Sequence, residues 1–173
     1  MEDSVRRVLE TQHGLRLLRC LGRGSFAEVY AAETADGRVP CAIKVSLERL
    51  EGNNPAVQEA LDHFELLRNL TGHPQLVSLM DVWLIAGYLV TRWELARGSL
   101  LDVLADYQRR GEAGIPPQEL RGYIWEAAQG IDFLHGQRVY HWGIKPANLL
   151  VFHGHVKVGD VGLSELAEAS GVS

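Results

Sequence analysis

The first third of the chain alternates apolar and polar residues, which is the pattern of half-buried β-strands. Two such runs, "GLRLLRCLGRGS" (14–25) and "FAEVYAAET" (26–34), are followed by the tetrapeptide "ADGR" and by a third run, "VPCAIKVSLE" (39–48). An Asp-Gly pair between alternating runs is a strong hairpin signal. The pattern therefore predicts an antiparallel meander of three strands.

The next segment, "NPAVQEALDHFELLRNL" (54–70), has the period of an amphipathic helix. Its apolar positions fall on one face and consist of Val57, Leu61, Phe64 and Leu67. Gly72 and Pro74 follow and end the helix. Two further apolar runs, "LVSLMDVWL" (76–84) and "GYLVTRWEL" (87–95), predict two more strands.

The character of the chain changes after a short connector near residues 94–99. "SLLDVLADYQRRG" (99–111) predicts a helix that glycine ends, and "PPQELRGYIWEAAQGIDFLHG" (116–136) predicts a second, buried helix. The apolar stripe of that second helix consists of Leu120, Ile124, Ala127, Ile131 and Leu134. Two short strands, "NLLVF" (148–152) and "HVKVG" (155–159), follow. The tryptophans expected in the core are Trp83, Trp93 and Trp125.

The composition is that of a globular protein, with 173 residues of which 46% are apolar and 23% charged. The net charge of −5 argues against a nucleic-acid-binding surface. No apolar stretch reaches the roughly 18 residues that a membrane span needs, and the polar start "MEDSVRRVLE" is unlike a signal peptide. Cys20 and Cys41 lack CxxC spacing and are expected to be reduced. We therefore expect a cytoplasmic chain with no membrane segment and no nucleic-acid partner.

A glycine-rich loop between the first two strands is the first candidate for chemistry. In "LGRGSFAEV" (21–29), Gly22 and Gly24 place no Cβ between the backbone and a ligand, so backbone N–H groups can approach phosphate oxygens. Lys44 stands fifteen residues after Val29 in the apolar run "CAIKV", where an anion would offset the cost of burying its charge. A plain turn and a lysine that extends to solvent at a strand end are the alternatives at this point.

Two later motifs make the pattern more specific. "YHWGIKPANLLV" (140–151) and "VKVGDVGLSEL" (156–166) follow the glycine-rich loop, the Ala-Ile-Lys strand, the helix and "HP" (73–74) in order. In that order these features resemble the eukaryotic-like Ser/Thr protein kinases of bacteria, over residues 14 to 168. Agreement of several spaced motifs is more specific than any one of them.

The resemblance implies an α+β, two-lobed protein kinase fold with ATP and Mg²⁺ in the cleft. It implies an N-terminal extension (1–13), an N-lobe with the complete antiparallel sheet and one helix (14–95), and the first part of a helical C-lobe (96–173). The residues implied to hold the nucleotide are Leu21, Gly22, Gly24, Ser25, Val29, Ala42, Lys44, Glu94, Ala96 and Leu150. Asn148 and Asp160 would hold Mg²⁺, while Lys145 would contact the transferred phosphoryl group. The bulk of Trp93 would close the inner pocket.

The departures from the family are as informative as the matches. Where the family has His-Arg-Asp, this chain has His141, Trp142 and Gly143. Loss of the aspartate removes the general base, which costs about 10²–10⁴ in rate. The helix should offer a glutamate to Lys44, but counting back from "HP" places His63 there, with Glu59 one turn earlier as a substitute. Val161 replaces the phenylalanine of the family's Asp-Phe-Gly triplet. This pattern is that of a pseudokinase.

Measured against the family, the chain stops at Ser173 without the activation segment, the substrate platform and the later helices. The apolar faces of 100–109 and 118–135 are therefore expected to be uncovered and to favour self-association. The sequence predicts a Ser/Thr-type kinase-like domain that binds ATP–Mg²⁺ with impaired phosphotransfer. A slow but active kinase with a protein substrate is one alternative; a non-catalytic interaction module or truncated gene product is another. "HGH" (153–155) predicts a hairpin tip, since no third zinc ligand lies near it.

Overall fold

The computed structural model describes residues 2–50, 55–70 and 72–161. These residues form two compact units. The sheet unit comprises the described residues up to 69 together with 78–95, and the helical unit comprises those of 70–77 and 96–161. The fold is α+β, as the sequence predicts.

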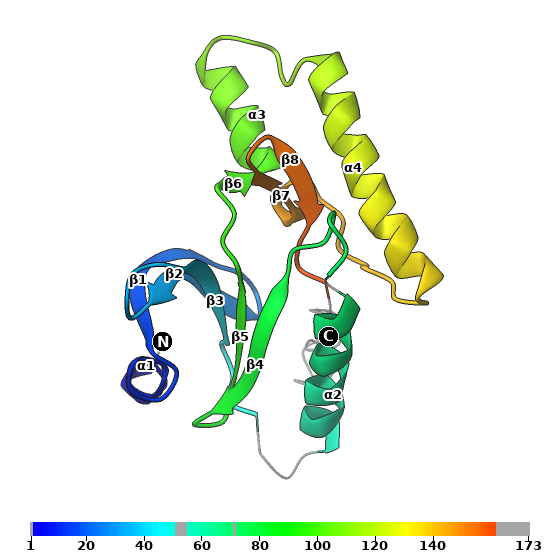
Figure 1. Cartoon of the computed structure of the whole chain (residues 1–173). Helices are drawn as coiled ribbons and strands as arrows, with labels where there is room; N and C mark the ends of the chain where they lie inside the picture. The colour runs from blue at the N-terminus through cyan, green and yellow to red at the C-terminus, as the bar shows by residue number, and fades with distance from the viewer. Residues whose placement is uncertain (1, 51–54, 71, 162–173) are drawn as a thin grey trace. The chain divides into compact units, whose positions relative to one another are not determined.

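The sheet unit contains a five-stranded antiparallel sheet (Figure 1). In chain order its described elements are α1 (Asp3–Thr11), β1 (Leu15–Arg23), β2 (Ala27–Thr34), β3 (Pro40–Ser46), α2 (Pro55–Leu70), β4 (Leu79–Ile85) and β5 (Tyr88–Glu94). The strand order in the sheet is β1-β2-β3-β5-β4. All five strands and α2 lie within a few residues of the positions that the hydrophobic pattern predicts, so these predictions are confirmed.

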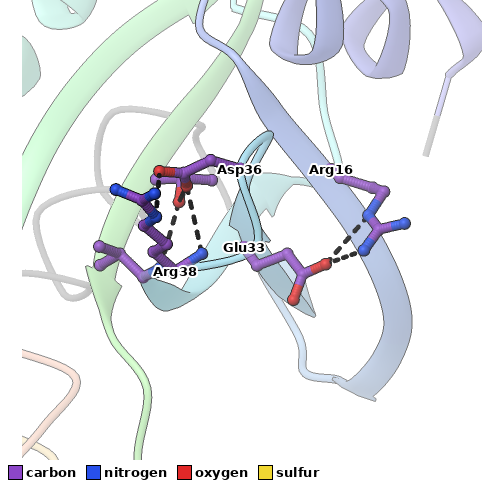
Figure 2. A network of polar contacts seen from close by, with 6 residues as sticks. Arg16, Glu33, Asp36 and Arg38 are labelled. Carbon is purple, nitrogen blue, oxygen red and sulfur yellow. Dashed lines mark hydrogen bonds and ion pairs between the residues drawn. The ribbon is translucent and has the colours of Figure 1, made fainter.

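The β2–β3 hairpin closes through the predicted Asp-Gly turn. Oδ1 of Asp36 accepts a hydrogen bond from the backbone N–H of Arg38 at 3.2 Å, and the glycine between them has a φ of 70° that glycine adopts without strain. On the neighbouring strand pair, Arg16 of β1 faces Glu33 of β2 and their side chains form an ion pair (Figure 2). Exposed pairs of this kind contribute little to stability, but they fit the register of the strands.

The helix α1 covers one face of the sheet and is not among the predicted elements. Val5 and Leu9 of α1 are 0% exposed. They pack into a cluster with strand residues Leu15, Leu17, Ala32, Cys41, Ile43, Val45, Ile85 and Val90. The signal was present, because Val5, Val8 and Leu9 have i, i+3, i+4 spacing and Gly14 follows the helix. Residues Asp3–Thr11 therefore form a helix, and a short turn follows it before β1.

The second helix of the sheet unit has the predicted amphipathic face. Val57, Phe64 and Leu67 of α2 are buried, and Leu61 is half-buried. None of them belongs to the cluster under α1, so the two helices cover different apolar surfaces. Trp93 of β5 is 4% exposed and Trp83 of β4 is half-buried, which confirms the core position of Trp93.

The helical unit combines two helices with a small antiparallel sheet. Its described elements are β6 (Gly98–Ser99), α3 (Leu100–Arg109), α4 (Pro117–Gly136), the 3-10 turn η1 (Pro146–Asn148), β7 (Leu149–Phe152) and β8 (His155–Val158). The strand order is β6-β7-β8. The predicted hairpin tip at "HGH" is confirmed, since His153 and Gly154 form the β7–β8 turn with positive φ angles of 51° and 89°.

Two polar arrangements fix α3 and its contact with α4. Ser99 and Asp102 form a capping box at the start of α3, in which each side chain hydrogen-bonds the backbone N–H of the other. The carboxylate of Glu119 in α4 accepts hydrogen bonds from the hydroxyls of Tyr107 in α3, at 2.5 Å, and of Tyr123, at 2.6 Å. These hydrogen bonds join the start of α4 to the end of α3.

Only the C-terminal half of α4 is buried, so the predicted buried stripe is wrong for the first half of the helix. Ala127 and Leu134 are buried, whereas Leu120 and Ile124 are 37% and 50% exposed. Trp125 is 69% exposed, which also contradicts its predicted core position. The helix packs against β8, with Gly130 close to Val158 and the Glu126 carboxylate accepting the backbone N–H of Val156 at 2.6 Å. A periodic stripe predicts a face, but burial needs an element on that face.

The close packing of α4 depends on Gly130. A Cβ built on this residue would lie 2.7 Å from the backbone oxygen of Gln75 and 3.2 Å from a methyl group of Val158. The same Gln75 oxygen accepts the backbone N–H of Val158 at 2.8 Å. Glycine at 130 therefore lets the helix backbone approach the segment that supports β8.

The described residues give no support for a metal cluster or a membrane span. None of the described helices has the length and hydropathy needed to cross a bilayer. No three His, Cys, Asp or Glu side chains among the described residues are placed to hold a metal together. Cys20 and Cys41 are both free, as expected, and burial raises the pKa of the Cys41 thiol.

Candidate functional site

The β1–β2 turn is the candidate phosphate loop. Gly22 pairs with Val29, and the backbone N–H of Gly24 donates to the carbonyl of Ala27 at 2.9 Å. Among the described residues, no atom lies within 4 Å of a Cβ built on Gly22, so its backbone faces open space. The other two predicted contacts in this loop, Leu21 and Ser25, are exposed. The turn therefore offers an accessible backbone surface on which a phosphate could lie.

An ion pair and a hydrogen bond between side chains stabilise the strand ends beside this turn. Nη1 of Arg23 lies 3.2 Å from Oε1 of Glu28, directly across the strand pair. The hydroxyl of Tyr30 donates to the other carboxylate oxygen of Glu28 at 2.6 Å. Burial and this hydrogen bond raise the pKa of Tyr30 to about 12, so the hydroxyl keeps its proton at neutral pH. The glycine turn is therefore supported by side chains on β1 and β2.

Strand register places several predicted residues on one face of the sheet. Lys44 of β3 faces Val29 of β2 on one side and Thr91 of β5 on the other. Ala42, two residues earlier, faces Trp93 of β5. Since side chains two apart point to the same face of a strand, Ala42 and Lys44 share one surface with Thr91 and Trp93. Ile43 points to the opposite face of the sheet, and α1 covers that opposite face.

Lys44 and Trp93 make a contact that the hydrophobic pattern does not predict. Nζ of Lys44 lies 5.6 Å from the centroid of the Trp93 ring, which is within the range of a cation–π interaction. The indole N–H of Trp93 donates to the hydroxyl of Thr91 at 2.7 Å. The available signal was the spacing of Thr91 and Trp93 by two residues on one strand, but the partner strand and its register are tertiary facts.

The segment between β5 and β6 carries the predicted adenine contacts. The backbone N–H of Glu94 donates to the carbonyl of Ser78 at 3.0 Å, and the Glu94 carboxylate accepts the backbone N–H of Ser78 at 2.7 Å. These bonds anchor the end of β5 inside the sheet unit. Ala96 begins the helical unit, and Arg97 after it donates its N–H to Val151 of β7 at 3.1 Å.

The candidate catalytic loop is held by two side chains. Nε2 of His141 donates to the carbonyl of Gly159 at 2.6 Å, and Nδ1 accepts the backbone N–H of Gly143 at 3.2 Å. This pattern requires a neutral imidazole with its proton on Nε2. The amide nitrogen of Asn148 donates to the carbonyl of Gly143 at 2.8 Å. Both backbone groups of Gly143 are therefore held, although it has no side chain.

The space around Gly143 suits a larger residue. A Cβ there would lie 3.6 Å from Nδ1 of His141 and 3.7 Å from Nδ2 of Asn148, which are ordinary contact distances. Gly143 is not among the residues with positive φ, so a side chain would not strain its backbone. Its neighbour Trp142 has a positive φ of 52° and is 81% exposed, and its ring lies 5.8 Å from that of Tyr140. The loop is thus held in place with glycine at position 143.

The predicted metal ligands lie on connected segments of the helical unit. The backbone N–H of Gly159 donates to the carbonyl of Asn148 at 2.8 Å, which places η1 beside the residue that precedes Asp160. Asp160 has a φ of 62°, a conformation that aspartate tolerates better than most residues and that recurs at functional sites. A carboxylate and an amide oxygen are ligands that Mg²⁺ accepts. Val161, after Asp160, is 1% exposed.

Two further predicted residues surround this pair. Leu150 of β7 packs against Gly159, where an added Cβ would lie 3.0 Å from the Leu150 side chain. Lys145 is exposed, and its carbonyl accepts the backbone N–H of Asn148 at 2.9 Å. The helical unit therefore brings together the residues predicted for the metal, the phosphoryl group and one side of the adenine.

None of the described side chains of α2 is identified as the carboxylate expected to pair with Lys44. His63, which sequence counting places at that position, is half-buried. Glu65 is exposed and pairs with Arg68 at 3.3 Å, so it faces away from a buried site. The side chain of Glu59 lies outside the described residues. The helix partner of Lys44 stays a prediction.

Comparison with known proteins identifies the family of the chain. A family model of the protein kinase domain matches residues 15–172. CBL-interacting protein kinase 19 from Oryza sativa subsp. japonica is 34% identical over 151 residues, which cover 87% of this chain and 28% of that protein. Serine/threonine-protein kinase srb10 from Schizosaccharomyces pombe is 29% identical over 162 residues, which cover 88% of this chain and 44% of that protein.

A third relative, CBL-interacting serine/threonine-protein kinase 7 from Arabidopsis thaliana, is 30% identical over 151 residues, which cover 87% of this chain and 34% of that protein. The chain therefore spans less than half the length of these curated relatives. The family model covers most of the chain, and the matched region contains the glycine turn, Lys44, the loop at 141–148 and Asp160. The chain belongs to the protein kinase family.

Proposed function

We propose that this chain is a Ser/Thr-type protein kinase domain that binds ATP with Mg²⁺ and is impaired in phosphotransfer. The observation that carries the proposal is the loop around Gly143. His141 and Asn148 hold its backbone, as a working loop would need, while the residue at the position of the general base has no side chain. In this proposal residues 14–95 form the N-lobe and residues 96–173 the first part of the C-lobe.

The residues proposed to hold the nucleotide have distinct roles. Gly22 and Gly24 would cover the phosphates with accessible backbone, and Lys44 would pair with the α and β phosphates. The adenine ring would contact the apolar side chains of Val29, Ala42 and Leu150, together with the backbone from Glu94 to Ala96. The open space above Gly22 supports the first role, since a side chain there would meet a bound phosphate before the backbone could.

Asn148 and Asp160 would hold the metal ion, and the donor set fits Mg²⁺. Because the amide nitrogen of Asn148 donates to Gly143, the oxygen is the end of this amide that would face a cation. When bound, Mg²⁺ would neutralise charge on the phosphates as the phosphoryl group moves. Lys145, exposed beside η1, would contact the transferred group.

Phosphotransfer is impaired because no residue of the loop can take the proton of a substrate hydroxyl. Gly143 has no acceptor, and both ring nitrogens of the buried His141 are engaged by backbone groups. Losing a general base costs about 10²–10⁴ in rate. A slow active kinase is the second candidate, and the intact loop geometry favours it, because phosphoryl transfer depends mainly on positioning and charge neutralisation.

Calorimetric titration and thermal shift with ATP–Mg²⁺ test nucleotide binding directly. We expect saturable binding that Lys44→Ala and Asp160→Ala each weaken strongly. Lys157→Ala is the matched control, because Lys157 also lies over an aromatic ring, 4.8 Å from the centroid of Phe152, but outside the proposed site. Absence of binding by the wild-type chain at saturating nucleotide would rule out the proposal.

A non-catalytic interaction module is favoured by a separate observation. Tyr140, Trp142 and Trp125 expose 51%, 81% and 69% of their surfaces in the helical unit. Exposed aromatic residues are common in protein interfaces. Concentration-dependent self-association in sedimentation experiments, reduced by Trp142→Ser, would support this candidate. The protein substrate, the bacterial type and the cytoplasmic location stay predictions from the sequence.

A further inference from the structure

Trp93 and Lys44 form a diagonal pair on adjacent strands. Ala42 faces Trp93 and Lys44 faces Thr91, so the lysine stands two residues along β3 from the position opposite the tryptophan. Diagonal neighbours on one face of a sheet are within reach of long and aromatic side chains. The Lys44 side chain bridges this offset, since its Nζ atom lies 5.6 Å from the ring centroid. Lys44 and the ring are therefore held together by the register of the sheet.

The ring that Lys44 approaches has a fixed orientation. Trp93 is 4% exposed and Thr91 is 3% exposed, so both side chains are enclosed. The indole N–H donates to the Thr91 hydroxyl at 2.7 Å, which sets the rotation of the ring about its side-chain bonds. A buried, hydrogen-bonded indole cannot turn without breaking that bond. The orientation of the indole ring is therefore fixed without a bound ligand.

We infer that Trp93 is a positioning residue, whose ring face orients the ammonium of Lys44 for the phosphates of the nucleotide. The inference rests on the proposed function, because it assigns Lys44 a phosphate partner. An aromatic face attracts an ammonium group through its quadrupole but leaves the positive charge intact. The ring itself carries no formal negative charge that would compete with a phosphate for the ammonium group. Trp93 therefore does more than fill the inner pocket with its bulk.

The geometry can be tested without any nucleotide. The chain has three lysines, Lys44, Lys145 and Lys157, so selective labelling gives three side-chain methylene signals in a carbon–proton NMR spectrum. Protons above a ring face are shifted upfield, and Trp93→Met should move the Lys44 signal downfield toward that of exposed Lys145. The Lys157 signal should stay, because its ring belongs to Phe152; conversely, Phe152→Leu should move only Lys157. A Lys44 signal that Trp93→Met leaves unchanged would overturn the inference.

Nucleotide affinity tests the functional part. Trp93→Met should lower the ratio of ATP–Mg²⁺ affinity to adenosine affinity by about threefold to thirtyfold, the range expected for loss of one cation–π contact. Adenosine has no phosphate, so the ratio cancels any change in the adenine pocket itself. Trp93→Phe keeps a ring and should restore the ratio to within about threefold of wild type. Thr91→Val keeps the ring but removes its hydrogen bond, and we expect an intermediate ratio.

The possible failures are distinguishable. If the wild-type chain binds no ATP, the proposed function is wrong and the inference, which depends on it, falls as well. If the wild type binds ATP and Trp93→Met leaves the ratio unchanged, the proposed function stands and the positioning role is refuted. A ratio that falls equally in Trp93→Met and Trp93→Phe would also refute it, because the phenyl face should serve Lys44. The unchanged Lys157 signal shows in each case that the helical unit is still folded.

Discussion

The sheet unit and the helical unit hold their candidate site residues in different ways. In the sheet unit, Ala42 and Lys44 stand on one face because strands alternate their side chains, and the ladder hydrogen bonds fix their positions. In the helical unit, the loop around Gly143 is irregular, and its backbone depends on the side chains of His141 and Asn148. The first arrangement is carried by the backbone, whereas the second is carried by a few side chains. A loop held by neighbouring side chains keeps its backbone conformation with glycine at position 143.

The largest effect expected from this difference is a gain of activity in Gly143→Asp. The Cβ fits between His141 and Asn148 at 3.6 and 3.7 Å, so the new carboxylate should occupy a loop that is already formed. We expect phosphotransfer from labelled ATP to a general protein substrate such as casein to rise by about 10²–10⁴-fold. The measurement is incorporation of label together with release of labelled phosphate.

Two controls define this result. Gly122→Asp adds the same charge at an exposed position of α4, where an added Cβ would meet no described atom within 4 Å, and should give no gain. Asp160→Ala in the Gly143→Asp background should abolish the signal if the activity belongs to this site. An inert Gly143→Asp variant that still binds ATP would show that more than the carboxylate is missing.

The second largest effect is expected on the stability of the sheet unit, whose core includes α1. Leu9 is 0% exposed, so Leu9→Ala should lower the free energy of unfolding by about 2–5 kcal/mol. Leu18→Ala, in the same unit but 52% exposed, should cost less than about 0.5 kcal/mol. Urea unfolding measures the difference, and hydrogen exchange should accelerate in β1 to β3. Equal effects of the two variants would mean that α1 is not part of the core.

The two units also differed in how far the sequence could predict them. Alternation in "CAIKV" and the helical spacing of 54–70 gave the strands and α2, because these elements follow local periodicity. The loop at 140–151 was located by motif spacing, but its hydrogen bonds join His141 to Gly159, eighteen residues away, and no local pattern reports such a bond. The Lys44–Trp93 contact likewise needs the β3–β5 register.

Other misses have more specific causes. Val5 and Leu9 have helical spacing, but whether a short helix at this place covers a sheet face depends on tertiary packing. Trp125 lies in an apolar run, but its side chain is 69% exposed, because the run alone does not tell which side of the helix another element covers. Glycine has a low helix propensity, so the sequence gives no reason for Gly130 within α4. The reason is the nearby backbone oxygen of Gln75, which leaves no room for a Cβ. Each of these features depends on tertiary contacts between elements, which the local pattern of a single sequence does not encode.

A smaller effect is expected at the closest contact of the helical unit. Gly130→Ala places a Cβ 2.7 Å from the Gln75 oxygen, so α4 or the Gln75 segment must move. Overpacking of this kind costs about 1–3 kcal/mol, and the better helix propensity of alanine offsets about 1 kcal/mol of it. We expect a lower urea midpoint and faster hydrogen exchange in β8. Gly122→Ala is the matched control, since the space around it is open, and it should stabilise the chain. A stabilised Gly130→Ala would contradict the packing described.

The smallest effect concerns the capping box at the start of α3, where a side chain again supports irregular backbone in the helical unit. Hydrogen bonds from the Ser99 hydroxyl and the Ser99 backbone N–H lower the pKa of Asp102 below its usual value. A carboxyl whose pKa is lower in the folded state stabilises the fold above its unfolded pKa of about 3.9. That contribution is lost as the pH falls through the folded pKa.

Asp102→Asn should therefore destabilise the chain by at most about 1 kcal/mol at pH 7, since the carboxylate is near the surface. The difference from wild type should shrink as the pH falls below about 4, because protonation removes the charge from the wild-type carboxyl as well. Thermal unfolding at pH 7 and pH 3 measures both differences. Asp106→Asn, on the exposed pair with Arg109, is the control and should change little at either pH. A cost of Asp102→Asn that is the same at both pH values would mean that the capping hydrogen bonds do not depend on the charge, and the helical unit would then rely less on this side chain than its geometry implies.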